Sequence, residues 1–328
     1  MRQSAASIID VIIVNYGTAQ LAIAAVESAL SQDLTNIEAT VHVLDNASPG
    51  NDEQILQDAH HVNGWGKQVN IWPEKTNHGF GRGNNVVLDA LARTKHPPDY
   101  VLLLNPDAAL RPNALQGLVT ALQDTPRAAA AGGCIYVPQT GPTASAFRFP
   151  GLISEIAQTI DFGPFDRLIN RWRVPLPVET TKGFVDWLSG ASVMFRFEAL
   201  KNCGFFDPAF FLYYEEVELM HRLRKAGWLC LYVPEVKIDH QAGAATGAFQ
   251  ESAVRKRRAS YLYTSWRIYF TRTRGWGFAL LVAVLMYPCA LINILHRRLR
   301  LKAPTLPLHF FRDHWTYVMR PLLRQDNI

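Results

Sequence analysis

The segment Tyr100–Asp107, YVLLLNPD, decides the fold of this chain. Residues 100–104 are wholly apolar, which predicts a strand buried on both faces, as at the centre of a parallel sheet covered by helices. Asn105, Pro106 and Asp107 follow directly, so polar groups stand at the carboxyl end of that strand. Because the proline ring fixes the backbone angle φ, Pro106 holds Asp107 at the tip of the strand.

The rest of the chain alternates strands and helices in the same way. The sequence predicts strands at 10–15, 41–44, 69–72, 191–197 and 228–233, and helices at 19–30, 52–59, 83–93 and 215–226. This alternation predicts an α/β fold, with a mostly parallel, Rossmann-like central sheet flanked by helices. Such sheets bind ligands at the carboxyl ends of their strands, so Asn15, Asp45 and residues 105–107 are expected around one pocket.

Composition bounds the architecture and the kinds of site. At 328 residues, with 48% hydrophobic and 19% charged residues, the chain suits one large α/β domain plus an extension. Its four cysteines show no CxxC spacing, which excludes a thiolate zinc site and a disulfide framework. Residues 1–9 contain no long apolar run, so no secretory signal is expected. Residues 138–182, rich in Pro, Gly and aromatic side chains, predict a long loop or a small helical insertion over the site.

The C-terminal residues 246–328 are expected to form a separate basic, apolar, helical extension. Residues 251–328 hold 14 of the 33 Lys and Arg but only 3 of the 28 Asp and Glu. The uncharged run 276–295, with basic residues on both sides, is just long enough to span a bilayer. Pro288 and Asn293 count against a clean spanning helix, so a helix lying in an anionic leaflet is favoured, ahead of a buried helix. No recognised nucleic-acid-binding module accompanies the basic residues, so no nucleic-acid partner is expected.

An acidic cluster follows an aromatic run at residues 210–222, FFLYYEEVELMHR. Glu215, Glu216 and Glu218 stand in the first turn of the predicted helix, where the helix dipole favours carboxylates. The preceding aromatic run indicates instead that the cluster opens against a core, and burial raises the proton affinity of a carboxylate, as a general base near neutral pH requires. From the residues alone, the helix cap and the catalytic base are equally supported.

Four motifs have both a functional and an ordinary interpretation. The glycine-rich segment 77–85, NHGFGRGNN, opens a helix and could bring backbone amides close to a phosphate, but it lacks the GK[ST] ending of a P-loop. His240 follows a strand and is either a metal ligand or a histidine satisfied by protein contacts. Residues 186–190, DWLSG, suit a platform for a sugar ring, or simply a tight connection. Asp107 suits a hard cation such as Mg²⁺ or Mn²⁺, or an ordinary Asn-Pro-Asp turn.

In their order along the chain, these motifs resemble a known family. VNY after the first strand, LDNAS after the second, NHGFGRGNN, LLLNPD, DWLSGASVMFR, FFLYYEEVELMHRLRKAGW and the later histidine resemble the inverting family-two glycosyltransferases of the GT-A fold. Within that family the resemblance is strongest to bacterial rhamnosyltransferase-like enzymes of cell-surface polysaccharide assembly. It covers roughly residues 8–245 and implies a catalytic domain at 1–245.

The resemblance implies a role for each matching residue. Asp45 would contact the nucleotide base, and Asp107 and His240 would hold a divalent metal, Mg²⁺ or Mn²⁺. Glu216 would be the catalytic base, but a Glu stands where the family usually has Asp, so Glu215 remains the alternative. The other expected contacts are Asn15, Tyr16, Asn46, Gly79, Gly81, Asn85 and Asn105 for the nucleotide, and Asp186, Trp187, Ser189 and Gly190 for the sugar or acceptor.

The function implied is metal-dependent, inverting transfer of a sugar such as L-rhamnose from a nucleotide diphosphate donor, a dTDP- or UDP-sugar. The acceptor would be a hydroxyl of a saccharide or of a polyprenyl-diphosphate-linked intermediate. The basic extension would hold the enzyme, as a peripheral or monotopic protein, on the anionic cytoplasmic face of the inner membrane. Two alternatives remain from the residues, namely a nucleotidyltransferase of related fold and a noncatalytic protein that binds sugar nucleotides or nucleic acid.

Overall fold

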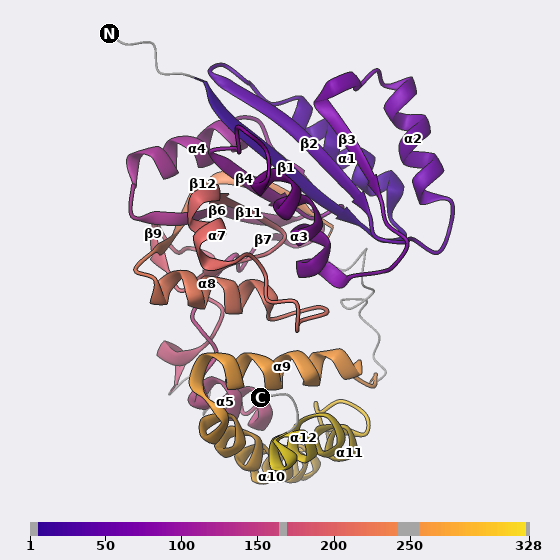
Figure 1. Ribbon diagram of the computed structural model, residues 1–328. Helices are drawn as coiled ribbons and strands as arrows, with labels where there is room; N and C mark the ends of the chain where they lie inside the picture. Colours follow the sequence, from indigo (N-terminus) through magenta and orange to yellow (C-terminus); the bar gives the residue numbers. More distant parts are fainter. Residues whose placement is uncertain (1–5, 164–168, 242–255, 326–328) are drawn as a thin grey trace.

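The computed structural model describes residues 6–163, 169–241 and 256–325. The chain forms an α/β domain with a central sheet and, beside it, a lobe made only of helices (Figure 1). We call the second part the helical lobe; it consists of α5 (Leu152–Ile160) and of the helices α9 to α12 that follow residue 256. The predicted domain boundary near residue 245 lies outside the described residues.

The strands are β1 (Ser7–Asn15), β2 (Ile37–Asp45), β3 (Val69–Pro73), β4 (Tyr100–Leu104), β5 (Ala108–Leu110), β6 (Ala128–Val137), β7 (Gly141–Thr143), β8 (Ala146–Phe147), β9 (Gly183–Val185), β10 (Trp187–Leu188), β11 (Ser192–Arg196) and β12 (Leu229–His240). The other helices are α1 (Ala19–Leu30), α2 (Asp52–Val62), α3 (Gly79–Ala92), α4 (Ala114–Asp124), α7 (Phe197–Cys203), α8 (Glu215–Lys225), α9 (Ser260–Arg274), α10 (Trp276–Leu299), α11 (Phe310–His314) and α12 (Arg320–Arg324). Short 3-10 turns lie at Gly66–Gln68 and Asn170–Trp172, and a π-helical turn at Trp315–Met319 joins α11 to α12.

The sheet separates two hydrophobic cores, and β1 contributes to both because successive side chains of a strand point to opposite faces. Ile9 and Val11 pack with α1, α2 and α4 on one face. Ile12 and Val14 pack with α3, α7 and α8 on the other face. Both faces of β1 are therefore covered, which explains its continuous run of apolar residues.

The sheet order is β3-β2-β1-β4-β11-β6-β12-β5. The pairings of β3, β2, β1 and β4 with one another are all parallel, as the sequence predicts. β11 then lies antiparallel between β4 and β6, and β12 runs parallel to β6. The prediction of a Rossmann-like α/β fold is confirmed, and β4 lies inside the sheet as its apolar sequence requires.

The segment from β5 to β6 is a part of the sheet that the sequence analysis does not assign; β7 and β9, which pair with β6 and β12, are also unassigned. β6 begins AAAAGG, and neither alanine nor glycine favours strands. Pairing with β11 and β12 on both sides overrides that weak local preference. The small residues suit this crowded place, since a Cβ on Gly133 would lie 2.4 Å from the carbonyl oxygen of Val236.

β12 is longer than the predicted strand at 228–233. Its register against β6 shifts between Val233 and Lys237, a segment that contains Pro234, which lacks the N–H that a regular ladder needs. Beyond this irregularity β12 pairs antiparallel with β5, with His240 opposite Ala108. The extra length therefore carries His240 to the residue that follows Asp107.

The helical lobe shares a third hydrophobic core with the α/β domain. Phe210 precedes α8 and Val217 lies in it. Both pack in this core with Tyr269 and Phe270 of α9 and with residues of α10. The predicted helical insertion within 138–182 is present as α5, which lies beside α9 and α10 in the helical lobe (Figure 1). The helical lobe is thus built from two distant stretches of sequence and is joined to the domain through apolar packing.

α10 continues through Pro288, so the proline does not end the predicted helix. Its inner face is buried, and there the side-chain amide of Asn293 donates hydrogen bonds to Ile160 O (3.1 Å) and Thr305 Oγ1 (2.8 Å). Its outer face exposes apolar side chains, among them Leu281, Leu291 and Leu295. By length and composition α10 could cross a membrane, but one side of it is already packed against the protein.

Candidate active site

The acidic cluster stands at the start of α8, directly after a strained turn. Tyr213 and Tyr214 have φ angles of 66° and 70°, in the left-handed region that costs a non-glycine residue about 1–2 kcal/mol. The turn is held from both sides: the N–H of Phe80 donates to Phe211 O (3.1 Å), and the hydroxyl of Ser265 donates to Leu212 O (2.9 Å). The conformation of this turn sets where α8 begins. We call residues 210–214 the catalytic turn, because it leads directly to Glu215 and Glu216, the two candidates for the catalytic base.

Glu215 and Glu216 occupy two different environments at this helix start. Glu215 is only 2% exposed, whereas Glu216 is half-buried and borders Gly190, where a Cβ would lie 3.5 Å from Glu216 Oε1. Burial raises the pKa of the Glu216 carboxyl, and burial together with the charge of Glu216 raises the pKa of Glu215 further. The Oε2 atoms of both side chains have no hydrogen-bond partner within the described residues. Glu215 and Glu216 therefore stand in the first turn of α8 and also have raised proton affinities, so the two interpretations drawn from the sequence apply to the same residues.

Glu218 is held by an ion pair. The Nε of Arg222 lies 2.8 and 2.9 Å from its two carboxylate oxygens, and the same guanidinium donates to the carbonyl oxygens of Cys203 and Phe205. Glu218 is almost fully buried, so this is not a solvated pair on a helix surface. Arg222 ties α8 to the end of α7 and steadies the helix that carries Glu216.

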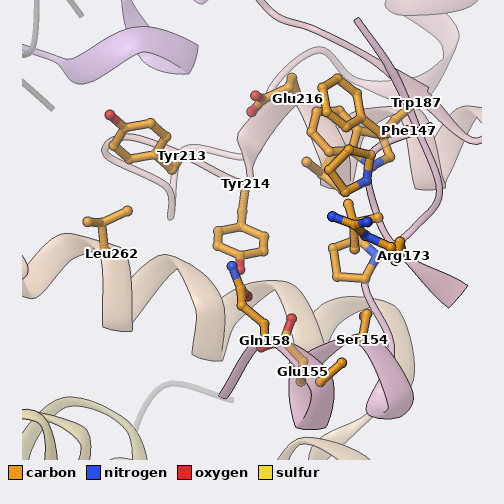
Figure 2. A pocket seen from close by; sticks show the side chains of 15 residues that line it. Phe147, Ser154, Glu155, Gln158, Arg173, Trp187, Tyr213, Tyr214, Glu216 and Leu262 are labelled. Carbon is orange, nitrogen blue, oxygen red and sulfur yellow. The ribbon is translucent and has the colours of Figure 1, made fainter. Parts of the chain in front are cut away.

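A cavity of about 470 Å³ lies in front of Glu216, between the α/β domain and the helical lobe. One wall is the indole of Trp187 stacked on Phe147, with ring centroids 4.1 Å apart. Figure 2 shows this pair close to Glu216, with Ser154 and Glu155 of α5 below. A flat apolar wall faced by a few polar groups suits a sugar ring. The cavity is lined by Phe147, Pro150, Ser154, Glu155, Ala157, Gln158, Arg173, Val174, Pro175, Trp187, Tyr213, Tyr214, Glu216, Val217 and Leu262.

Glu155, on α5, is a second buried carboxyl of this cavity. The indole N–H of Trp266 donates to its Oε2 at 2.8 Å, which joins α5 to α9. Burial raises the pKa of Glu155 to about 7, against the weaker opposite effects of the Trp266 hydrogen bond and the nearby Arg258. Near neutral pH this carboxyl is therefore present in both protonation states.

The predicted nucleotide residues gather around the ends of β1 and β2. The amide of Asn15 donates to Asp45 Oδ1 (3.0 Å) and Asp52 Oδ2 (2.9 Å). Asn46 donates to Gly79 O (3.0 Å) and accepts the N–H of His78 (2.9 Å), so it links β2 to the start of α3. Asp52 is an addition from the structure, since the sequence analysis assigned it only to a helix. Tyr16 is exposed beside this group.

The glycines of α3 make room for protein atoms. A Cβ on Gly79 would lie 1.9 Å from Phe211 O, and one on Gly81 would lie 3.1 Å from Phe206 Cβ. Asn85 is occupied in the same contact, because its amide donates to Phe206 O (2.8 Å) and its oxygen accepts the Phe206 N–H (3.1 Å). The helix therefore begins at Gly79, earlier than the predicted Gly83. It packs against Phe211 of the catalytic turn and against Phe206 before that turn.

Asp107 and His240 form a pair that the chain separates widely. His240 Nε2 lies 3.0 Å from Asp107 Oδ1, and the backbone N–H of Gln241 donates to Asp107 O. A divalent cation often takes only one or two protein carboxylates and completes its shell with phosphate oxygens and water. Carboxylate and imidazole together suit Mn²⁺, and the described residues contain no group of three or more His, Cys, Asp or Glu that could hold a metal ion. The donor set fits a cation shared with a diphosphate.

Asn105, a predicted nucleotide contact, lies two residues before Asp107, and its backbone N–H donates to Ala191 O.

The four predicted sugar-binding residues are only partly brought together. Trp187 lines the cavity and Gly190 borders Glu216. Asp186 instead pairs with Arg224, accepts the N–H of Phe149 (2.9 Å) and lines a separate, smaller cavity. The backbone of Ser189 donates to Ser145 O. The turn expected at DWLSG is partly a strand, β10, which pairs with β8 and so stacks Trp187 on Phe147.

Several lining residues were missed by the sequence analysis, including Phe147, Glu155, Gln158 and Arg173. All four lie within 138–182, where the only signal was an excess of Pro, Gly and aromatic residues. Packing of α5 against the other helices of the lobe brings these side chains opposite α8.

Known proteins resemble the chain in sequence over most of the α/β domain. The family model described as Glycosyltransferase like family 2 matches residues 6–261. An N-acetylglucosaminyl-diphospho-decaprenol L-rhamnosyltransferase of Mycobacterium tuberculosis is 34% identical over 188 residues, which cover 55% of this chain and 61% of the relative. Rhamnosyltransferase WbbL of Escherichia coli is 28% identical over 183 residues, which cover 54% of this chain and 66% of the relative. The chain therefore spans less than two thirds of the length of these relatives.

Solved structures resemble it in fold. A mannosyltransferase, PcManGT from Pyrobaculum calidifontis, in complex with GDP-Man and Mn²⁺, superposes with a TM-score of 0.59 at 15% identity, covering 99% of this chain and 89% of the other. GalNAc-T7, solved with UDP, GalNAc and Mn²⁺, superposes with a TM-score of 0.61 at 12% identity, covering 99% of this chain and 59% of the other. At such identities the likeness concerns the fold alone.

Proposed function

The chain belongs to the glycosyltransferase-like family 2, and from this premise we propose that it transfers a sugar from a nucleoside diphosphate donor to an acceptor hydroxyl, with inversion at the anomeric carbon. One observation carries the proposal: the half-buried carboxyl of Glu216, with a raised pKa, lines a cavity of about 470 Å³ that Trp187 and Phe147 also line. A base of raised proton affinity beside a flat apolar wall suits the removal of a proton from a sugar hydroxyl.

Glu216 takes the proton of the acceptor hydroxyl as that oxygen attacks the anomeric carbon. The bond from this carbon to the diphosphate oxygen breaks, and the diphosphate leaves with the electron pair. Glu215 is less suited as the base, because it is buried beside the cavity and does not line it. Asp107 and His240 would hold a divalent cation, Mg²⁺ or Mn²⁺, which when bound would neutralise charge on the leaving diphosphate.

The nucleotide is assigned to the group around Asn15, Asp45 and Asn46. This assignment is supported by their position at the carboxyl ends of β1 and β2, where open α/β sheets bind ligands. The activity for which the two relatives are named supports rhamnose as the sugar transferred, and the mycobacterial name specifies L-rhamnose. We propose a dTDP- or UDP-sugar as the donor. The name of the mycobacterial relative supports an acceptor linked to a polyprenyl diphosphate.

A lipid-linked acceptor requires the enzyme to work at a membrane. The outer face of α10 exposes apolar side chains such as Leu291 and Leu295, and Arg297, Arg298 and Arg300 stand at its end. An apolar helix face with basic residues at one end suits insertion into an anionic leaflet in the plane of the membrane. We assign the enzyme to the cytoplasmic face of the inner membrane on this basis.

The test is a transfer assay with a panel of dTDP- and UDP-sugars and with N-acetylglucosaminyl-diphospho-decaprenol as acceptor. We expect a divalent cation to be required, a nucleoside diphosphate to be released, and the product to have the opposite anomeric configuration to the donor, as measured by NMR. Release of pyrophosphate from a nucleoside triphosphate would indicate a nucleotidyltransferase instead. Binding of sugar nucleotides without hydrolysis or transfer would contradict an enzymatic role.

A further inference from the structure

A second cavity, of about 340 Å³, lies inside the helical lobe and meets the cavity in front of Glu216. The two cavities share five lining residues, Glu155, Gln158, Tyr213, Tyr214 and Leu262. These residues belong to the catalytic turn, α5 and α9, so the two cavities adjoin at these side chains. A ligand that places one end beside Glu216 can reach the second cavity by passing these side chains.

The walls of the second cavity combine apolar surface with polar groups that lack partners. Trp266, Met286 and Phe310 contribute apolar surface. The hydroxyl of Tyr263 and both ring nitrogens of His314 have no hydrogen-bond partner within the described residues, although these residues are only 4% and 1% exposed. Burying such groups unpaired is costly, so they indicate a polar ligand.

Two neutral hydrogen-bond donors and one cation line this cavity. Burial lowers the pKa of His314 to about 4, so at neutral pH the ring is uncharged and one of its nitrogens carries an N–H that can donate to a ligand. The Tyr263 hydroxyl is a second donor, and the cationic Arg258 also lines the cavity. Hydrogen-bond donors and a guanidinium are the partners that phosphate oxygens take.

α10 and α11 each line the second cavity with one side and expose apolar side chains to solvent on or beside the other. Met286 lines the cavity from α10, whose outer face exposes Leu291 and Leu295. Phe310 and His314 line it from α11, beside the exposed Phe311 and Trp315. The cavity thus lies between Glu216 and the apolar surface that we assign to the membrane.

We propose that the second cavity binds the diphosphate and the first prenyl units of the lipid-linked acceptor. This proposal rests on the proposed function for the identity of the acceptor. Tyr263, His314 and Arg258 contact the diphosphate, and Trp266 and Phe310 contact the hydrocarbon, which continues toward the apolar surface. The saccharide then occupies the first cavity with its hydroxyl at Glu216. The helical lobe is therefore an acceptor-binding element as well as a membrane contact.

The probe for this site is farnesyl diphosphate, which carries a diphosphate and three prenyl units but no sugar. Its binding is followed by tryptophan fluorescence, because Trp266 lines the cavity, in the presence of a chelator and of excess dTDP and UDP to keep the probe from the donor site. Farnesol and inorganic pyrophosphate are the comparison ligands. We expect farnesyl diphosphate to bind at least about tenfold more tightly than either, because it makes both kinds of contact.

Three variants test the walls of the cavity. Tyr263→Phe and His314→Phe remove the unpaired polar atoms, and each should weaken binding at least about tenfold, the effect of one hydrogen bond to a charged group. Val318→Trp fills the cavity and should abolish binding. Val62→Trp, on the 84% exposed Val62 of α2, is the matched control and should bind like the wild type. Thermal unfolding identifies any variant that fails to fold. If His314→Phe or Val318→Trp does not fold, the binding affinity of Tyr263→Phe, which removes only one oxygen atom, tests the proposal.

The outcomes separate this inference from the proposed function, because probe binding needs neither donor nor turnover. Equal affinity of wild type, Tyr263→Phe and His314→Phe for farnesyl diphosphate would overturn the inference, as would equal affinity of the wild type for farnesol. In the transfer assay, the inference predicts a raised KM for the decaprenyl-linked acceptor in the same variants, with the KM for the donor unchanged. Probe binding without transfer from any donor would instead contradict the proposed function alone.

Discussion

Gly79 packs directly against the backbone of Phe211, so closely that a Cβ on Gly79 would lie 1.9 Å from the carbonyl oxygen of Phe211. The contact joins the first residue of α3, beside the predicted nucleotide group, to the catalytic turn before Glu216. The neighbouring Phe80 N–H donates to the same oxygen at 3.1 Å. The position of Glu216 therefore depends on the position of α3.

We expect Gly79→Ala to lower the transfer rate at least about tenfold and to destabilise the protein by about 2 kcal/mol or more, because the methyl group must displace the catalytic turn. Gly64→Ala is a matched control. Gly64 also has a positive φ, 63°, but a Cβ there would meet no atom within 4 Å. It should cost only about 1 kcal/mol of backbone strain and leave the rate unchanged. Equal rates in the two variants would show that the contact does not position Glu216.

The two carboxyls at the start of α8 should differ in their effect on the reaction. Glu216→Gln should lower kcat by about 10²–10⁴-fold while leaving the affinity for the donor unchanged, because it removes the base and keeps the shape. Glu215→Gln should retain most of the activity. Because the pKa of Glu216 is raised, the acidic limb of the pH–rate profile should lie above the ordinary pKa of a glutamate, 4.5. A larger loss in Glu215→Gln would transfer the role of base to Glu215.

Glu155 should make the free energy of unfolding depend on pH. Its pKa is about 7 in the folded protein, against an ordinary value of 4.5, so its protonation stabilises the fold below pH 4.5. That contribution, on the order of 3 kcal/mol, is lost as the pH rises to 7. Glu155→Gln keeps an oxygen acceptor for Trp266 but cannot ionise. Denaturant unfolding at pH 5 and pH 8 should show a gain in stability for the variant at pH 8 relative to wild type, and a parallel pH dependence of the two proteins would contradict the assignment.

Removal of the Asp107 carboxylate should weaken cation binding. In Asp107→Asn, we expect Mn²⁺ titrated in the presence of dTDP, followed by electron paramagnetic resonance, to bind at least about tenfold more weakly, since the charged oxygen ligand is lost. His240→Ala should weaken binding less, because diphosphate or water can replace one neutral ligand. Asp239→Asn is the control. Asp239 is the neighbour of His240 on β12, but its carboxylate pairs with Arg111. Unchanged Mn²⁺ affinity in Asp107→Asn would remove it from the cation site.

The outer face of α10 should govern attachment to membranes. In flotation with liposomes that contain anionic lipid, we expect the double variant Leu291→Glu/Leu295→Glu to stay in solution, because it places two carboxylates in the apolar contact. Val62→Glu, at a more exposed apolar residue on α2, should float with the wild type. Recovery of the wild type should fall at high salt if the basic residues contribute. Equal flotation of the double variant would place the membrane contact elsewhere.

Much of the α/β fold follows from local sequence. The apolar run of β4 and the alternation around it predict the parallel strands correctly, because the central strands β1 and β4 are buried on both faces. β6 could not be predicted, since its alanines favour no strand until β11 and β12 pair with it. The start of α3 at Gly79 also depends on a distant contact, with Phe211.

The sequence by itself determined the order of the elements, the carboxylates at the strand ends, Asp45 and Asp107, and the carboxyls in the first turn of α8. These follow from periodicity and residue type, which act over a few neighbouring residues. Only the tertiary structure decided that His240 meets Asp107, that Glu216 lines the cavity while Glu215 is buried beside it, and that α5 joins the helical lobe to form that cavity. Contacts of this kind join residues far apart in the chain, so they depend on how buried surfaces pack, which no local pattern specifies.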